Sequence, residues 1–245
     1  MQTSLKNLYQ LFVIFTMLTV CGIVLFTFRI VSLGWLLPFN RMYAMPFISK
    51  LTMSLVGIKL DLSKKIELPN QPVFITFNHN SYLDIFALTA LGLNNTRFML
   101  SEKTIKILPV TLVALSIGVT YIPQKKHKKR RLAYFERIEK EIMTKKFNIA
   151  GSSEGVHEHK HHIDNFNKGV YHMATVCKLN IIPLFIWVPE ASNPFNKYRY
   201  FKRGTIFIEP METISTEGWT LQNIDENKEA VRSLFVAKFE HYNKL

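Results

Sequence analysis

The sequence predicts an α/β fold, with a mixed, mostly parallel sheet flanked by helices and a membrane-embedded N-terminal helix or helix pair. Apolar runs of strand length alternate with longer stretches whose apolar residues recur every three or four positions, as in strands alternating with helices. Residues 8–28 carry no charged side chain, and the length of 245 residues suits one domain plus a membrane segment. We therefore divide the chain into a membrane anchor over residues 1–57 and an α/β domain over residues 58–245.

The N-terminal apolar run is long enough to cross a bilayer. Residues 8–28 would form a helix about 31 Å long at about 1.5 Å per residue. A cleavable signal peptide is the first alternative, but the run is long and no small-x-small cleavage site follows it. The second alternative is a helix pair that enters one leaflet. The apolar character continues past Arg29, and the two helices would be joined by a bend at Gly34 or Pro38.

The basic residues around this run predict its orientation. Only Lys6 precedes the run, whereas Arg29, Arg41 and Lys50 follow it. Because basic residues near a membrane segment favour the cytoplasmic side, the following domain is expected to face the cytoplasm.

The charge balance predicts an anionic partner. The chain has 31 basic and 18 acidic residues, a net charge of +13. Nucleic acid and an anionic membrane surface both fit such a charge, but the sequence has no zinc-finger, RNP or basic-zipper pattern. The apolar anchor therefore favours the membrane surface and argues against nucleic acid. Of the two cysteines, Cys21 lies within the apolar run, far from Cys177, so neither a disulfide nor a cysteine metal site is expected.

The remaining elements follow from periodicity and from Pro and Gly punctuation. The helix at residues 42–56 is amphipathic and suits either the membrane surface or packing on the domain. In the long helix that opens with the basic run 125–131, the predicted apolar stripe is Leu132, Phe135, Ile138 and Ile142. Strands are expected at residues 73–77, 97–100, 119–122, 147–150, 181–188 and 203–208. Helices are expected at 42–56, 103–116 (interrupted or started near Pro109), 125–146, 165–178 and 226–242.

The most informative stretch is the one after the strand at residues 73–77. Asn78 and His79 follow the strand directly, Ser81 suits a helix N-cap, and Asp84 falls in the first helical turn. A histidine at the end of a strand can present one ring nitrogen to a ligand, while a nearby carboxylate holds the other and fixes the tautomer. The alternative is a plain capping box with an ordinary loop histidine.

This stretch resembles the His-x4-Asp signature of the glycerophospholipid acyltransferase family, whose bacterial type is the lysophosphatidic acid acyltransferase. The family form, Asn-His-x-Ser-x-x-Asp, is met at every fixed position. Further blocks occur in the family's order, and the resemblance runs from about residue 58 to residue 211. Residues 153–157 resemble the Pro-Glu-Gly-Thr-Arg block, 166–169 the Phe-Lys-x-Gly element, 182–184 the Val-Pro-Val strand, and 204–210 the late strand ending near Gly-x-Pro.

The resemblance implies a membrane-associated O-acyltransferase that needs no cofactor. It would move a fatty acyl group from acyl-CoA or acyl carrier protein to the hydroxyl of a lyso-glycerolipid acceptor, by default 1-acylglycerol 3-phosphate, giving phosphatidic acid. His79 would act as general base and Asp84 would orient its ring, as in a serine-protease triad. Backbone amides at residues 153–155 are candidate donors to the oxyanion.

The resemblance also implies a set of substrate-binding residues, with two departures from the family. Asn78 and Ser81 belong to the first block, Glu154 and Gly155 to the third, and Lys168 and Gly169 to the next.

In the family, arginines associated with the acceptor phosphate end the second and third blocks, where this chain has Gln124 and His157. Neither side chain offers a planar guanidinium. Either the acceptor lacks a phosphate monoester, as another lysophospholipid or an aminolipid would, or Lys103, Lys125 or Lys126 supplies the charge.

Two polar stretches are unusually rich in basic residues or in histidine. The basic run 125–131 opposes the helix dipole, so we expect it to contact lipid or acyl-donor phosphates; a solvated helix end is the alternative. Residues 157–162 are rich in histidine but match no standard zinc spacing, so a polar loop over the site is expected and no metal. A non-catalytic lipid-binding membrane protein is the competing function, and the intact pair of His79 and Asp84 argues against it.

Overall fold

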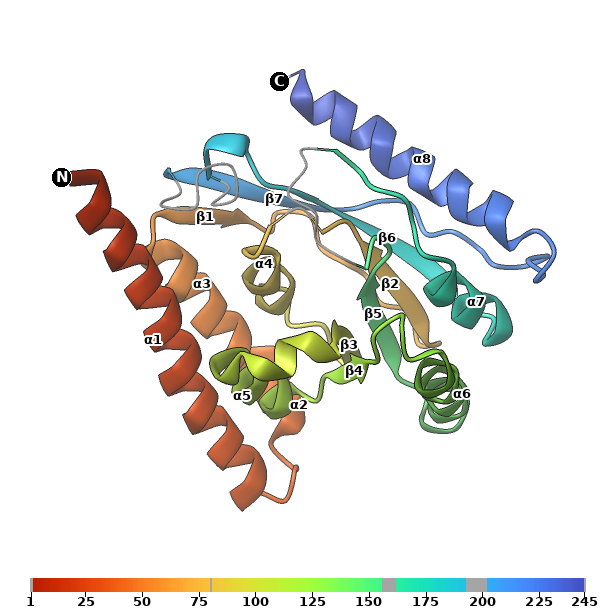
Figure 1. Cartoon of the computed structure of the whole chain (residues 1–245), viewed down its shortest axis with the longest axis horizontal. Helices are drawn as coiled ribbons and strands as arrows, with labels where there is room; N and C mark the ends of the chain where they lie inside the picture. The colour runs from red at the N-terminus through yellow and green to blue at the C-terminus, as the bar shows by residue number, and fades with distance from the viewer. Residues whose placement is uncertain (1, 80, 156–161, 193–201, 245) are drawn as a thin grey trace.

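A seven-stranded sheet forms the centre of the molecule in the computed structural model, which describes residues 2–79, 81–155, 162–192 and 202–244 (Figure 1). The strand order is β1-β7-β6-β2-β5-β3-β4, and neighbouring strands are parallel except β6 and β7. The predicted mixed, mostly parallel sheet is therefore confirmed. The strands are β1 (Ile58–Asp61), β2 (Val73–Phe77), β3 (Thr96–Ser101), β4 (Thr120–Ile122), β5 (Asn148–Ser152), β6 (Asn180–Trp187) and β7 (Gly204–Pro210).

The central strand β2 lies between β5 and β6 and is buried along its whole length. Burial on both faces explains its uninterrupted apolar sequence. The sequence did not predict β1, because this edge strand has only four residues and buries little beyond Ile58. Its charged side chains Lys59 and Asp61 are typical of an edge strand.

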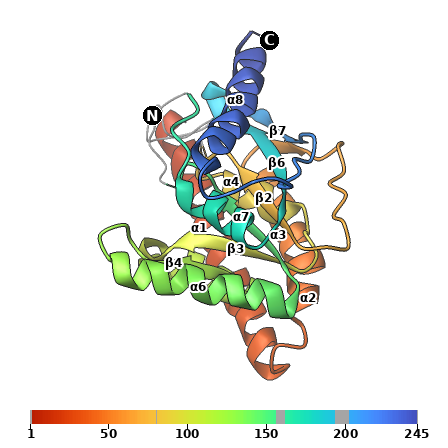
Figure 2. The same ribbon diagram turned by 90° about the vertical axis from the view of Figure 1, so that its right-hand side faces the viewer.

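Helices cover both faces of the sheet and produce two apolar cores. On one face lie α1 (Gln2–Val31), α3 (Met45–Leu55), α4 (Asp84–Ala90) and α5 (Leu108–Ile117), which pack on Val73, Ile75 and Phe77 of β2. On the other lie α6 (Lys128–Lys145), α7 (Lys168–Val176) and α8 (Ile224–Asn243), which pack around Phe74. Figure 2 shows α6 and α8 on the second side of the sheet. This division follows from the alternation of side chains along a strand.

The helix predictions are confirmed with shifted ends. The predicted break near Pro109 is real, because a 3-10 turn at Glu102–Lys106 precedes α5. The helix expected from residue 125 begins at Lys128. Its predicted apolar stripe was wrong at Leu132, which is 62% exposed, whereas Tyr134 is buried. A short 3-10 turn, Glu190–Ser192, follows β6.

The N-terminal helices form an apolar arm docked on the domain. Helix α1 contains a 24-residue apolar segment, Leu8–Val31, that is long enough to cross a membrane. Only 22% of its most apolar stretch of 18 residues is buried. The chain then reverses at Gly34, passes through α2 (Leu37–Phe39) and a π-helical turn (Asn40–Ala44), and returns as α3 (Figure 1). This reversal agrees with the expected bend at Gly34 or Pro38.

Polar contacts at the end of α5 hold this arm in place. The Arg29 guanidinium donates to Leu115 O, and Asn40 donates to Ser116 O at 3.2 Å. Arg41 is buried and donates twice to Ile117 O, at 3.1 and 2.7 Å. These donors satisfy carbonyls that the last turn of a helix leaves without intrahelical partners. Arg29 and Arg41, assigned from the sequence to membrane orientation, therefore also fix α1 and α3 to the domain.

Candidate active site

The end of β2 positions His79 through the buried side chain of Asn78. The Asn78 amide donates to Ile186 O and accepts from Ile186 N, both at 2.8 Å, so this side chain continues the pairing with β6 after the strand ends. His79 is therefore held at the carboxyl edge of the sheet, where ligands of α/β proteins commonly bind.

The first turn of α4 brings Asp84 against His79. His79 Nδ1 lies 2.9 Å from Asp84 Oδ2, and the same oxygen accepts from Ser81 N at 3.0 Å. Ser81 Oγ accepts in turn from Leu83 N at 3.2 Å, but α4 begins at Asp84 with Leu83 as its N-cap, so Ser81 organises the preceding turn rather than capping the helix as predicted. The Asp84 side chain is only 1% exposed, whereas that of His79 is 31% exposed. With Nδ1–H donating to the carboxylate, the neutral imidazole carries its lone pair on Nε2.

A second carboxyl group, that of Glu154, lies beneath the histidine. Glu154 Oε1 accepts from His79 N at 3.4 Å. Burial is the main cause that raises the pKa of Glu154 to about 8; the nearby carboxylates of Asp164 and Asp84 also raise it, and the hydrogen bond from the His79 amide lowers it. Glu154 is therefore mostly protonated at neutral pH and lies beside the histidine as a neutral acid.

The turn that carries Glu154 is tightly anchored. The Asn167 side-chain amide donates to Ser153 O at 3.2 Å and also to Glu154 O. Gly155 has φ +72°, and a Cβ there would lie 2.5 Å from Asn167 Nδ2, so both the backbone conformation and the space require glycine.

The backbone amides of this turn already have acceptors within the protein. Ser153 N donates to Phe77 O at 3.3 Å, and the amides of Glu154 and Gly155 donate to Ser152 Oγ at 3.2 and 3.3 Å. The expected oxyanion donors are thus engaged in this structure, and a shift of the turn would be needed to release them.

A cavity of about 400 Å³ opens beside His79 and Asp84. Its walls are mainly apolar, and its polar groups come from the end of β3 and the 3-10 turn after it, from the end of β5, from the segment after β4, from α6 and from the start of α7. Such a combination suits a ligand with a long apolar chain and a charged or polar head. The apolar lining includes Phe77, Ile85, Leu88, Phe98, Met99, Leu100, Val113, Ala114, Ile117, Val119, Ile122 and Val170; the polar lining includes Ser101, Lys103, Gln124, Lys125, Arg131, Ser152 and Asn167.

The structure brings several of the expected site residues to this cavity. Lys103, Gln124, Lys125 and Gly155 line it together with the His–Asp pair. The Gln124 side chain donates to Ser101 Oγ at 2.8 Å, and its backbone amide donates to Glu102 Oε1 at 2.9 Å.

Other expected site residues lie away from the cavity lining. Asn78 and Ser81 are buried behind the histidine, where they position it. Lys168 forms an ion pair with Asp225 of α8 at 2.6 Å, and Gly169 lies against the Phe135 ring. His157 and the histidine-rich stretch as far as residue 161 fall outside the described residues.

Arg131 lines the cavity, but the sequence predicted only the basic run 125–131 and did not single out this residue. It is half-buried in the first turn of α6, donates from Nη1 to Pro123 O at 2.9 Å, and lies 5.3 Å above the Phe135 ring. Burial lowers the pKa of Arg131, yet an arginine remains cationic at neutral pH. Its spacing from Phe135 was the available signal, since residues four apart share a helix face.

The protein has an α/β fold in which a histidine, held by a carboxylate, faces an apolar cavity. This combination is that of an acyltransferase. The chain belongs to the acyltransferase family, whose model matches residues 59–187, from β1 to the end of β6.

Individual relatives agree with this assignment. The chain is 25% identical over 188 residues to the 1-acyl-sn-glycerol-3-phosphate acyltransferase of Saccharomyces cerevisiae, covering 74% of this chain and 60% of that protein. It is 22% identical over 171 residues to a putative 1-acyl-sn-glycerol-3-phosphate acyltransferase, acl-2, of Caenorhabditis elegans, covering 69% of this chain and again 60% of the relative. The chain thus spans about 60% of the length of these curated relatives.

A solved structure shares the fold over nearly the whole chain. The crystal structure of the 1-acyl-sn-glycerophosphate (LPA) acyltransferase PlsC from Thermotoga maritima superposes with a TM-score of 0.76 at 15% identity. The match covers 99% of this chain and 96% of that one, so the N-terminal helices are part of the shared fold.

Proposed function

We propose that this protein is a membrane-associated O-acyltransferase that moves a fatty acyl group from an acyl thioester to the hydroxyl of 1-acylglycerol 3-phosphate, giving phosphatidic acid. The observation that carries the proposal is the contact of 2.9 Å between His79 Nδ1 and Asp84 at the mouth of an apolar cavity. The relatives named as 1-acyl-sn-glycerol-3-phosphate acyltransferases support the choice of acceptor.

The chemistry follows from the histidine tautomer. His79 Nε2 takes the proton of the acceptor hydroxyl as its oxygen attacks the thioester carbonyl carbon, and Asp84 stabilises the imidazolium that forms. The tetrahedral intermediate then collapses: the carbon–sulfur bond breaks, and the leaving thiolate takes the proton back from the imidazolium. The acceptor supplies the nucleophilic hydroxyl, so no serine of the enzyme is acylated.

The acceptor phosphate requires cations that the second and third family blocks do not supply in this chain. Arg131, Lys103 and Lys125 line the same cavity as His79. Arg131 offers the two-pronged geometry that suits a phosphate, and its guanidinium is already held by Pro123 O and Phe135. We assign the phosphate to Arg131, with the two lysines adding charge, and assign the apolar part of the cavity to a fatty acyl chain.

The anchor and its orientation complete the proposal. Residues 1–57 form the membrane-anchoring part and residues 58–245 the acyltransferase domain, which faces the cytoplasm, where acyl-CoA and acyl carrier protein are found. The unburied apolar surface of α1 and the basic residues that follow it support this arrangement.

A panel of acceptors tests the proposal. Purified protein is given labelled acyl-CoA or acyl carrier protein with 1-acylglycerol 3-phosphate, lysophosphatidylcholine, lysophosphatidylethanolamine, a lyso-aminolipid or monoacylglycerol, and the product is identified. We expect phosphatidic acid as the main product and its loss in His79→Ala. Preferential use of an acceptor without a phosphate monoester would refute the acceptor assignment. A lack of transfer to any acceptor would favour a non-catalytic lipid-binding protein.

A further inference from the structure

A second cleft, of about 740 Å³, lies at the β1 edge of the sheet, opposite the edge formed by β4. The N-terminal part of α1, the end of α3 and β1 form its walls, and it shares no lining residue with the cavity beside His79. Neither the proposed chemistry nor the acceptor site uses this cleft.

Four basic side chains converge on the cleft from separate parts of the chain: Lys6, Lys50, Lys59 and Arg203. All four are exposed, and no acidic residue from the described part of the chain lines the cleft. Within the described ranges, none of the four forms an ion pair. Asp61 lies outside the cleft lining, and its carboxylate accepts from Ser63 N, which lowers its pKa. The charges of Lys59 and Lys64 also lower this pKa. Like charges around one cleft repel one another, and an anion bound among them relieves this repulsion.

The cleft is built on a fixed backbone. Gly57 joins α3 to β1 with φ +86°, and the Arg203 Cγ would lie 3.0 Å from a Cβ at this position, so the arginine stem crosses the glycine. The buried Gln10 side chain donates to Val56 O at 3.0 Å, which ties α1 to the end of α3. These two contacts join α1, which carries Lys6, to the end of α3, which carries Lys50, and place Arg203 against the turn before β1.

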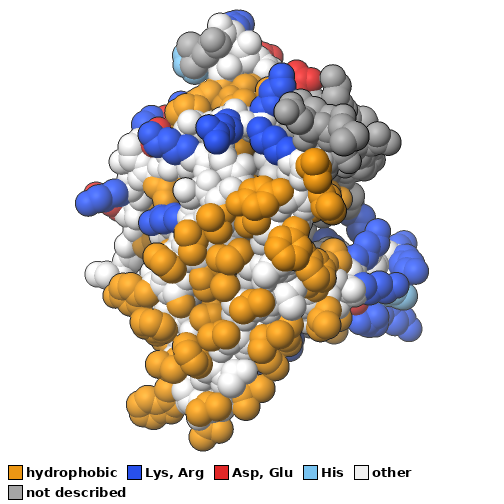
Figure 3. Space-filling model, turned by 90° about the vertical axis from the view of Figure 1, so that its left-hand side faces the viewer, with side chains coloured by type: hydrophobic (Ala, Val, Ile, Leu, Met, Phe, Trp, Pro, Cys, Tyr) orange, Lys and Arg blue, Asp and Glu red, His pale blue; other side chains and the backbone are white. Residues whose placement is uncertain are grey.

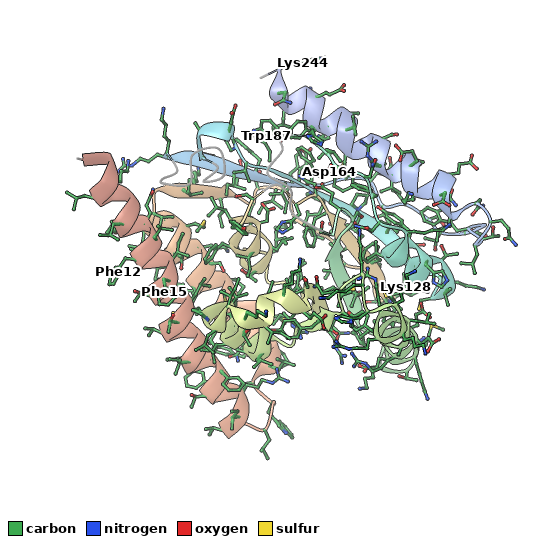
Figure 4. The ribbon with its side chains drawn as sticks, viewed as in Figure 1. Phe12, Phe15, Lys128, Asp164, Trp187 and Lys244 are labelled. Atoms are coloured by element: carbon green, nitrogen blue, oxygen red, sulfur yellow. The ribbon has the colours of Figure 1, made fainter. Side chains whose placement is uncertain are left out.

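The apolar surface next to the cleft favours a phospholipid over other anions. Figure 3 shows a broad hydrophobic surface with a band of Lys and Arg side chains above it. Phe12 and Phe15, on α1, point away from the sheet in Figure 4 and are 66% and 62% exposed. The exposed apolar side chains of α1 and α3 include Leu5, Leu8, Phe12, Phe15, Phe47, Leu51 and Leu55. Nucleic acid or an acidic protein needs no such apolar surface, whereas a phospholipid presents a phosphate directly above its acyl chains.

We propose that this cleft binds the phosphate of an anionic membrane phospholipid, whose acyl chains lie along the exposed surface of α1 and α3. The proposal rests on the membrane association described above, but not on catalysis. The ammonium and guanidinium groups would each donate to phosphate oxygens, as in charge-assisted hydrogen bonds elsewhere. The bound lipid would be neither substrate nor product, and it would fix the depth of the protein in the membrane.

Lipid titration of the full chain in a neutral detergent tests this proposal. Phosphatidylglycerol or phosphatidylcholine is added, and bound lipid is measured by native mass spectrometry. We expect wild type to prefer phosphatidylglycerol, and Lys50→Gln with Arg203→Gln to weaken phosphatidylglycerol binding roughly 10- to 30-fold. A second pair, Lys50→Gln with Lys59→Gln, spares the Arg203 contact with Gly57 and should give the same loss.

A matched pair controls for diffuse charge. Lys106→Gln with Lys202→Gln removes the same charge from exposed positions outside the cleft, Lys106 lying beside the exposed Ile105 and Ile107. This pair should bind phosphatidylglycerol like wild type. Equal losses in cleft and control pairs, or equal binding of both lipids by wild type, would overturn the proposal. Acyl transfer measured in the same preparations reports on the proposed function separately, because kcat of the cleft pairs should equal that of wild type.

Discussion

At the scale of single residues, the charge state around His79 depends on two carboxyl groups with different surroundings. Asp84 accepts from Ser81 N and lies against the imidazole, so its negative charge has partners. Glu154 lies under the His79 backbone in a buried position that raises its pKa. A buried acid with a raised pKa stays neutral at neutral pH, so Glu154 is suited to a different role from a carboxylate that holds the imidazole.

The burial of Glu154 predicts a pH dependence of stability. Between the ordinary pKa of 4.5 and the folded value of about 8, the folded protein retains a proton that the unfolded chain has released. The free energy of unfolding therefore falls as pH rises through this window. Thermal unfolding in detergent between these pH values should show a smaller decline for Glu154→Gln than for wild type, whereas the exposed control Glu217→Gln should follow wild type. Equal declines for all three proteins would refute the assignment.

Arg131 and its neighbour Arg130 have different surroundings: Arg131 lines the cavity, and Arg130 lies on the surface. The Arg131 side chain enters the cavity, whereas Arg130 is 64% exposed and pairs with Glu102 at 2.9 Å. Arg131→Gln should raise KM for 1-acylglycerol 3-phosphate about tenfold or more, because a charge-assisted hydrogen bond to phosphate is lost.

The controls decide between the acceptor and the donor as the ligand of Arg131. KM for the acyl donor should stay the same in Arg131→Gln, and Arg130→Gln should leave both KM values near those of wild type. A rise only in the donor KM would show that Arg131 binds the donor phosphates instead.

At the scale of elements, apolar runs predicted the buried strands well, because β2 and β6 are covered on both faces. The short edge strand β1 lacked this signal. Periodicity misplaced the buried face of α6, since Leu132 matched the spacing but Tyr134 is the buried residue. Tyr134 was left out of the predicted apolar stripe because its ring carries a hydroxyl group. The ring nevertheless packs in the second core, around Phe74.

Helix α5 forms part of the cavity wall, so a larger side chain on this helix should change the preference for acyl-chain length. Ala114 is 2% exposed and lines the cavity, so Ala114→Phe should fill part of the space assigned to an acyl chain. We expect the ratio of kcat/KM values for long and short acyl-CoA donors to fall about tenfold or more, since each excluded methylene costs binding. The exposed Ala133→Phe on α6 serves as control. An unchanged ratio in Ala114→Phe would place the donor chain elsewhere.

At the scale of the whole molecule, the sequence predicted the reacting pair but not the complete site. His79 and Asp84 are five residues apart, so a local motif was sufficient to pair them. Gln124, in the segment after β4, and Arg131, on α6, reach the same cavity, and only the folding of the sheet brings them to His79. The cleft at β1 combines Lys6 with Arg203, a distance in sequence that no motif spans.

The same long-range packing joins the anchor to the domain. Contacts from Arg29, Asn40 and Arg41 to the end of α5 place α1 and α3 beside a wall of the cavity. In the proposed function, α5 would therefore lie between the membrane-anchoring helices and the space assigned to an acyl chain.

The most direct test of the central claim is single-turnover transfer of a labelled acyl group to 1-acylglycerol 3-phosphate by His79→Ala. We expect the rate of the chemical step to fall about 10²- to 10⁴-fold, the usual contribution of a general base. His172→Ala is the matched control, because this histidine lies on α7 beside Glu139 and outside the cavity lining, and its rate should equal that of wild type. Retention of the wild-type rate by a folded His79→Ala protein would contradict the account.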